Sequence, residues 1–110
     1  MIITKVALDE SQYLATFREP MGDVTATERG DVVDIWPYFD SLTEEDWQGY
    51  SAADGGVVQR VYRSGDGRYD HALIPTTVAE VFMVLVIDLE RQAVYGHRLL
   101  DLPRLYGFRH

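Results

Sequence analysis

The sequence predicts a mainly β fold, namely an antiparallel meander of about six to seven strands, curled or partly closed into a small barrel, with two short helices. Two observations predict this class. Short runs rich in β-branched and aromatic residues recur along the chain, separated by turns that contain glycine. One run, residues 81–87, is apolar throughout, as expected of a strand covered on both faces, and it is too short to span a bilayer.

Length and composition predict one folded domain over residues 1–110. The 110 residues are 46% hydrophobic and 25% charged, which is typical of a globular protein. The chain has no cysteine, so disulfides and cysteine-based nucleophiles or metal sites are excluded. Its first residues lack the apolar length of a secretion signal, and we therefore expect a cytoplasmic protein without membrane insertion.

The N-terminal part predicts a strand followed by a helix. Residues 2–8 alternate loosely between apolar and polar side chains, as a first strand does. Within residues 8–20, Asp9 is placed as an N-cap and Gln12 stands at the capping-box position. The expected apolar contacts of this helix use Leu8, Tyr13, Leu14 and Phe17.

Residues 24–39 predict two extended segments joined by a turn at Gly30. The second segment alternates Val33 and Ile35 with Asp34 and with the aromatic residues Trp36 and Tyr38. Pro37 lacks an amide donor, so we expect this strand near a sheet edge.

Residues 39–50 contain an acidic and aromatic cluster that suggests either a binding loop or a capped helix. Thr43 as N-cap, Asp46 at the capping-box position and Gly49 as terminator describe a helix of little more than one turn. The helix dipole favours acids in that first turn. We therefore favour capping over a functional acidic cluster.

Residues 57–76 predict a hairpin around the sequence SGDG. With Gly65 and Asp66 at the centre of the turn, Tyr62 opposes Tyr69 and Arg60 opposes His71. The sequence leaves open which face is buried. In the predicted register, one face of the hairpin carries Val58, Arg60, Tyr62, Tyr69, His71 and Leu73, and the other face carries Val57, Gln59, Val61, Asp70, Ala72 and Ile74.

Residues 80–89 and 93–102 predict a second hairpin, at the centre of the fold. A three-residue tip would place Leu89 opposite Ala93 and His97 opposite Leu85. Gly96, inside the returning strand, indicates a bulge, a bend or the close approach of another backbone.

Histidines are the first candidates for chemistry, because imidazole can act as acid, base or metal ligand near neutral pH. His97 precedes Asp101 by four residues on one predicted strand face, so the two could form a His–Asp dyad. A metal site from His71, His97 and either Asp101 or Glu80 is conceivable, but no ligand motif supports it, and we assign no metal and no cofactor.

A ligand-binding pocket is the other candidate site. Its anion contact would be an arginine, and its walls would be tyrosines shared with the two histidines. Recognisable signatures of nucleophilic or nucleotide-binding sites are absent from the sequence. The expected ligand-binding residues are Arg60, Tyr62, Tyr69, Tyr95 and Arg98.

Charge directs the functional hypothesis. The net charge is −8, and residues 1–55 hold 12 acids against 3 bases, whereas residues 56–110 hold 6 acids against 7 bases. Such a chain is a poor candidate for nucleic-acid binding. We expect the arginines of the second half to meet acids of the first half, within the fold or across a dimer.

The leading hypothesis is a protein-binding or oligomerising module, for example an inhibitor or immunity-type neutraliser of a basic partner. The alternative is a small-molecule binding protein or hydrolase-like enzyme that uses the pocket of histidine, tyrosine and arginine side chains.

Overall fold

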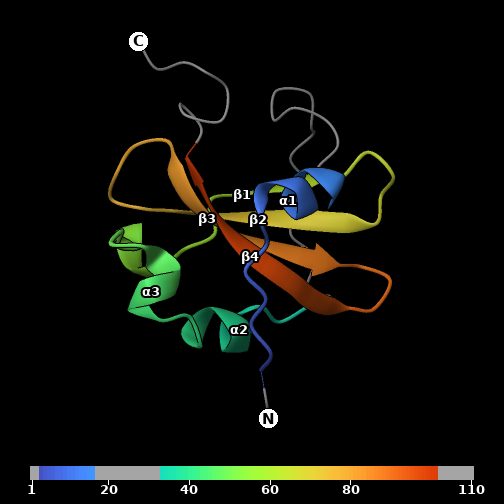
Figure 1. The fold of residues 1–110 in the computed structure, drawn as a ribbon, viewed down its shortest axis with the longest axis horizontal. Coiled ribbons are helices and arrows are strands. Elements are labelled where there is room, and N and C mark those ends of the chain that lie inside the picture. The colour runs from blue at the N-terminus through green and yellow to red at the C-terminus, as the bar shows by residue number, and fades with distance from the viewer. Residues whose placement is uncertain (1–2, 17–32, 102–110) are drawn as a thin grey trace.

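The computed structural model describes residues 3–16 and 33–101, which form a sheet with helices on both faces (Figure 1). The helices are α1 (Glu10–Thr16), α2 (Trp36–Asp40), α3 (Glu44–Trp47) and the 3₁₀ turn η2 (Ala53–Gly55). The strands are β1 (Arg60–Arg63), β2 (Tyr69–Pro75), β3 (Val81–Asp88) and β4 (Ala93–Asp101). None of the described helices is long and apolar enough to cross a membrane.

The strands confirm the mainly β, antiparallel meander. They lie in the order β1-β2-β3-β4, and each pairs antiparallel with the next. The described residues contain four strands, and the sheet is open, so the prediction of six to seven strands and a partly closed barrel is not confirmed. The first extended segment predicted near Gly30 lies outside the described residues.

The predicted apolar centre is β3, where all eight residues are buried. It lies between β2 and β4 and is apolar on both faces because helices cover both (Figure 1). The core on the α1 face contains Leu8, Tyr13, Tyr62, Leu73, Phe82, Val84, Val86 and Leu100. The core on the face of α2 and α3 contains Ile35, Tyr38, Val61, Ala72, Ile74, Met83, Leu85 and Ile87.

Two predicted strands take other conformations. In residues 3–8, the pairing with the sheet is a single parallel bridge between Ala7 and His97, and the Val6 amide donates to the Tyr38 hydroxyl (3.0 Å). The edge strand predicted around Pro37 is helix α2, in which proline occupies the first turn, where no amide donor is required. The Asp34 carboxylate accepts from the Trp36 amide (3.1 Å) at the start of this helix.

Local capping rules located α1 and α3. Asp9 and Gln12 exchange reciprocal hydrogen bonds of 3.0 and 2.9 Å at the start of α1. Thr43 and Asp46 form the predicted capping box of α3. The apolar face expected for α1 is only partly correct, because Leu14 is 43% exposed whereas Tyr13 is fully buried.

The β1–β2 register differs from the prediction by two residues. Tyr62 lies opposite His71 and Arg63 opposite Asp70. The turn is longer than expected, because the Ser64 amide bonds to the Tyr69 carbonyl and Gly67 adopts a φ of 76°. A shift of two preserves which side chains share a face. In the observed register Arg63 and Asp70 form an ion pair of 2.8 Å.

The β3–β4 hairpin has the predicted pairing of His97 with Leu85 but a different tip, since Ala93 opposes Asp88 instead of Leu89. The strand register shifts by one residue between Val86 and Ile87, as at a β-bulge, and this shift accounts for the different pairing at the tip. The N-terminal segment approaches Gly96 closely. A Cβ at this position would lie 2.8 Å from Leu8 Cγ and 2.9 Å from the Val6 carbonyl oxygen.

Candidate functional site: a buried histidine network beneath an acidic helical layer

The two histidines of the predicted pocket lie on opposite faces of the sheet. His71 packs edge-on against Tyr13 of α1, and His97 packs against Tyr38 of α2. A single pocket or metal site that uses both rings is therefore not formed. Among residues 3–16 and 33–101, no group of three histidine or acidic side chains is arranged to hold a metal ion.

His71 is fully buried on the α1 face. Its Nε2 lies 3.2 Å from the Thr16 hydroxyl and its Nδ1 lies 3.4 Å from the Tyr62 carbonyl. The Thr16 hydroxyl also donates its single hydrogen to the Tyr13 carbonyl (2.8 Å), which can only accept, so His71 belongs to a closed set of contacts with α1 and β1. Burial lowers the pKa of His71 to about 4, against the ordinary 6.5, so the ring is neutral near pH 7.

The expected ligand-binding residues lie on the α1 face of the sheet. Several of them use their polar groups or rings in contacts with other residues of the protein. Arg60 donates to the Tyr62 hydroxyl (3.1 Å), the Tyr69 and Tyr95 rings stack at 5.6 Å, and Arg98 donates to the Leu8 carbonyl (3.2 Å). Arg98 also borders a depression of about 290 Å³ at the β4 edge. This depression is lined by Glu10, Gln48, Tyr50, Arg98, Leu99, Leu100 and Asp101.

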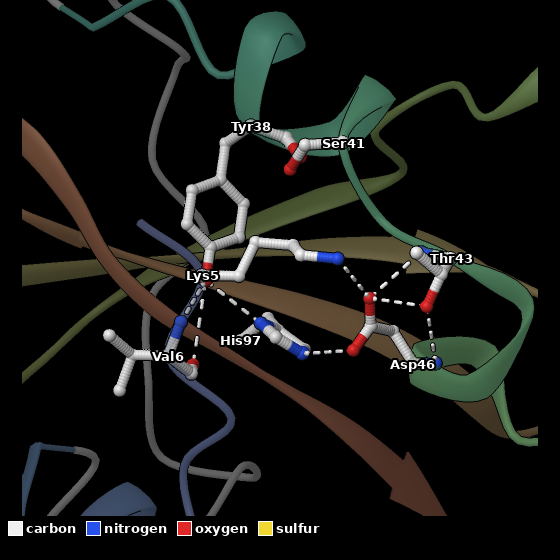
Figure 2. Close-up of polar contacts among 7 residues, drawn as sticks. All are labelled: Lys5, Val6, Tyr38, Ser41, Thr43, Asp46 and His97. Carbon is white, nitrogen blue, oxygen red and sulfur yellow. Dashed lines mark hydrogen bonds and ion pairs between the residues drawn. The ribbon is translucent and has the colours of Figure 1, made fainter. Parts of the chain in front are cut away.

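His97 lies at the centre of a hydrogen-bonded chain on the opposite face (Figure 2). The Val6 amide donates to the Tyr38 hydroxyl (3.0 Å), which lies 2.8 Å from His97 Nδ1. His97 Nε2 lies 3.5 Å from Asp46 Oδ1. Because a carboxylate only accepts, the neutral ring carries its hydrogen on Nε2 and receives the Tyr38 hydroxyl hydrogen at Nδ1.

Asp46 has a second role that the capping prediction did not include. Its Oδ2 accepts from Lys5 Nζ (3.0 Å) and from the Thr43 amide (2.8 Å), while Oδ1 faces His97 (Figure 2). Burial alone would raise the pKa of this carboxyl, but the Thr43 and Lys5 hydrogen bonds outweigh it and lower the pKa to about 2. Asp46 is therefore a permanent anion that joins α3, the N-terminal segment and β4.

The Tyr38–His97–Asp46 order resembles a catalytic relay, but the burial of Tyr38 and His97 favours a structural role. Burial raises the pKa of Tyr38, which keeps the phenol neutral, and burial lowers the pKa of His97 despite the opposing effect of Asp46. Both side chains are buried. The carboxylate that lies beside His97 is that of Asp46, not that of Asp101. Asp101 is four residues from His97 along the strand, which separates their Cα atoms by about 13 Å.

An acidic helical layer, residues 33–59, covers the face that holds His97. It comprises α2, α3 and η2 with their connections. The layer contains no Lys or Arg, and its acids are Asp34, Asp40, Glu44, Glu45, Asp46 and Asp54. Of these, Asp46 is the acid with an ion pair to another described residue.

Among the described residues, the arginines of the second half form no ion pair with the acids of the layer. Arg63 pairs with Asp70 (2.8 Å), and Arg68 pairs with Asp88 (3.3 Å) and Glu90 (3.4 Å). These acids also belong to the second half. The expectation that arginines would meet acids of residues 1–55 is therefore not met by the ion pairs among described residues.

The acidic layer also presents an apolar depression of about 320 Å³, which is lined by Trp36, Gly55, Gly56, Val57 and Val58. Trp36 is 40% exposed and Val57 is 60% exposed. Sequence reasoning missed this feature because it assigned Trp36 to a strand. The available signal was Pro37, which is favoured in the first turn of a helix.

Residues 3–16 and 33–101 form a small antiparallel meander of four strands with helices on both faces, and one of its two helical layers is acidic and partly apolar. No protein-family model, curated protein or solved structure matches the chain.

Proposed function

We propose that this protein is a binding module for a basic protein partner and that the acidic helical layer is its contact surface. The observation that carries the proposal is the charge of residues 33–59, which contain six acids and no Lys or Arg. A surface of one sign attracts a partner of the opposite sign, accelerates association and disfavours partners of like charge. An inhibitor or immunity-type neutraliser is one form that such a module takes.

The exposed apolar side chains within the layer support binding to a protein. Interfaces combine a desolvated apolar centre with a polar rim, and tryptophan is enriched among the residues that dominate binding energy. Trp36 and Val57 provide the apolar part, Asp54 directly precedes the lining residue Gly55, and the Asp34 carboxylate accepts from the Trp36 amide.

A second copy of the chain is a weaker candidate for this surface. A symmetric dimer would bring two acidic layers together and place like charges opposite each other. The apolar strand β3 also needs no subunit contact, because helices of the same chain cover both of its faces. The small-molecule alternative loses support because His71 and His97 lie on opposite faces of the sheet.

The test measures binding of a labelled poly-lysine peptide by fluorescence anisotropy at several salt concentrations. One variant neutralises exposed acids of the layer through Glu44→Gln, Glu45→Gln and Asp54→Asn. A matched variant removes the same charge elsewhere through Glu10→Gln, Glu80→Gln and Glu90→Gln. All six positions are exposed.

We expect salt-sensitive binding by the natural chain, about tenfold weaker binding by the layer variant and a smaller change in the matched variant. Equal weakening of both variants would show that net charge alone attracts the peptide, and the proposed surface would be wrong. Absence of binding at low salt would overturn the function itself.

A further inference from the structure

We propose that the depression beside Trp36 receives an arginine side chain of the basic partner. The inference rests on the proposed function, because it assigns one partner group to one place in the acidic helical layer. It requires an accessible aromatic face, a surface for an aliphatic stem and a nearby negative charge. The described residues provide an indole that is 40% exposed, an exposed Val57 and the exposed acids Asp34 and Asp54.

The depression is open because glycines form part of its lining. Gly55 and Gly56 have φ values of 74° and 91°, where side chains are disfavoured. A Cβ on Gly56 would lie 2.6 Å from Phe39 Cζ, so this backbone lies directly against the Phe39 ring. Val57, 60% exposed, then offers an aliphatic surface beside Trp36.

Trp36 is held in place although it is 40% exposed. Its ring meets Phe39 edge-on at 5.3 Å, and Phe39 meets Trp47 in the same way at 5.8 Å. The Asp34 carboxylate accepts from the Trp36 amide. An aromatic face that is already ordered costs less conformational entropy on binding than a mobile one.

The charge around this face selects a cation. Asp34 contacts the Trp36 backbone, and Asp54 directly precedes the lining residue Gly55. A guanidinium stacks on an indole face and forms hydrogen bonds in its own plane, whereas a lysine ammonium is a compact, strongly hydrated charge. The arginine stem can lie along Val57 while its head remains at the carboxylates. Arginine therefore fits this site better than lysine.

The experiment uses the full chain with Trp47→Phe, which leaves Trp36 as the one tryptophan. Three short synthetic peptides are titrated, in which serine alternates with arginine, with lysine or with citrulline, the neutral isostere of arginine. Trp36 fluorescence reports contact, and anisotropy of a peptide label reports affinity independently.

We expect Trp36 fluorescence to change with the arginine peptide, which should bind about three- to tenfold more tightly than the lysine peptide. Citrulline should bind weakly. Trp36→Leu, made in the original background, keeps the apolar bulk but removes the aromatic face, and it should abolish the preference for arginine. Val78→Ala, at an apolar side chain that is 47% exposed and does not line this depression, is the matched control and should leave the preference unchanged.

The outcomes separate the two proposals. If arginine and lysine peptides bind equally and Trp36→Leu has no effect, while neutralisation of the acidic layer weakens both, the arginine site is wrong and the basic-partner function stands. If the citrulline peptide binds as tightly as the arginine peptide, the proposal that this site recognises a positive charge is wrong. If no cationic peptide binds, both proposals are overturned.

Discussion

Asp46 on α3 and His97 on β4 meet through Oδ1 and Nε2 at 3.5 Å, and this contact joins the acidic helical layer to the sheet (Figure 2). The same carboxylate caps α3 and binds Lys5. One side chain therefore connects three segments that are distant in sequence. The proposed binding surface depends on this connection, because α3 is only four residues long and is marginal as an isolated helix.

Replacement of Asp46 by alanine should lower the free energy of unfolding by about 1–3 kcal/mol, because it removes a helix cap, an ion pair and the acceptor for His97. Urea denaturation followed by circular dichroism measures the change. Glu45→Ala is the matched control, since it removes an exposed acid from the same helix and leaves the capping box intact. Equal stability of the Asp46 variant and the natural chain would contradict the role of Asp46 as a connection.

Replacement of Tyr38 by phenylalanine should lower the free energy of unfolding by about 1–2 kcal/mol. The change leaves His97 Nδ1 and the Val6 amide without the hydroxyl that serves both. Chemical denaturation measures the loss. Tyr50→Phe removes a hydroxyl from a half-buried tyrosine outside the network and serves as control. If both variants lose the same amount, the hydroxyl of Tyr38 has no special role.

Stability should fall as the pH drops below about 6.5, the ordinary histidine pKa. Burial lowers the pKa of His71 to about 4, so the unfolded chain binds the proton more readily than the folded one. Between pH 6.5 and about pH 5 this group should cost roughly 1–2 kcal/mol of stability. His97 acts in the same direction, since burial also lowers its pKa.

Denaturation midpoints across this pH range measure the effect, and His71→Phe should reduce the slope because it removes one titrating group. NMR of the His71 ring gives an independent reading, and the ring should remain neutral at pH 6. An unchanged slope in the variant, or a ring that titrates near 6.5, would contradict this prediction.

Replacement of Gly96 by alanine should destabilise the protein by about 1–3 kcal/mol, because the added methyl group would overlap Leu8 and the Val6 carbonyl. Thermal or urea unfolding measures the loss. In a Leu8→Ala background, the Gly96→Ala change should cost less than it does in the natural chain but should still destabilise, since the carbonyl of Val6 remains. Full tolerance of Gly96→Ala would contradict the close approach of the N-terminal segment to β4.

Much of the fold could be predicted because its determinants are local. Capping residues located α1 and α3, and the apolar run at residues 81–87 identified the central strand. Gly96 indicated a bulge or close approach, and both features occur there. Side-chain alternation gave the correct faces of the β1–β2 hairpin even with the wrong register, because a shift of two residues preserves the face.

The candidate site could be predicted only in part. His97 was recognised as a candidate, but its partners Tyr38 and Asp46 come from helices that have no sequence relation to β4. The prediction joined His97 to Asp101 because both lie on one strand face. Likewise, the prediction placed His71 and His97 in one pocket. Alternation shows which residues of one strand share a face, but it does not show whether residues of two different strands lie on the same face of the sheet.

By itself, the sequence determined the antiparallel meander, the capped helices, the buried central strand and the acidity of residues 33–59, because each follows from local periodicity, capping chemistry or charge count. Tertiary structure alone decided that helices close both faces of the sheet, that Asp46 serves His97, and that Trp36 lies partly exposed in an acidic layer. These outcomes depend on contacts between distant segments. Such contacts are selected by the packing of the whole chain, which no local pattern encodes.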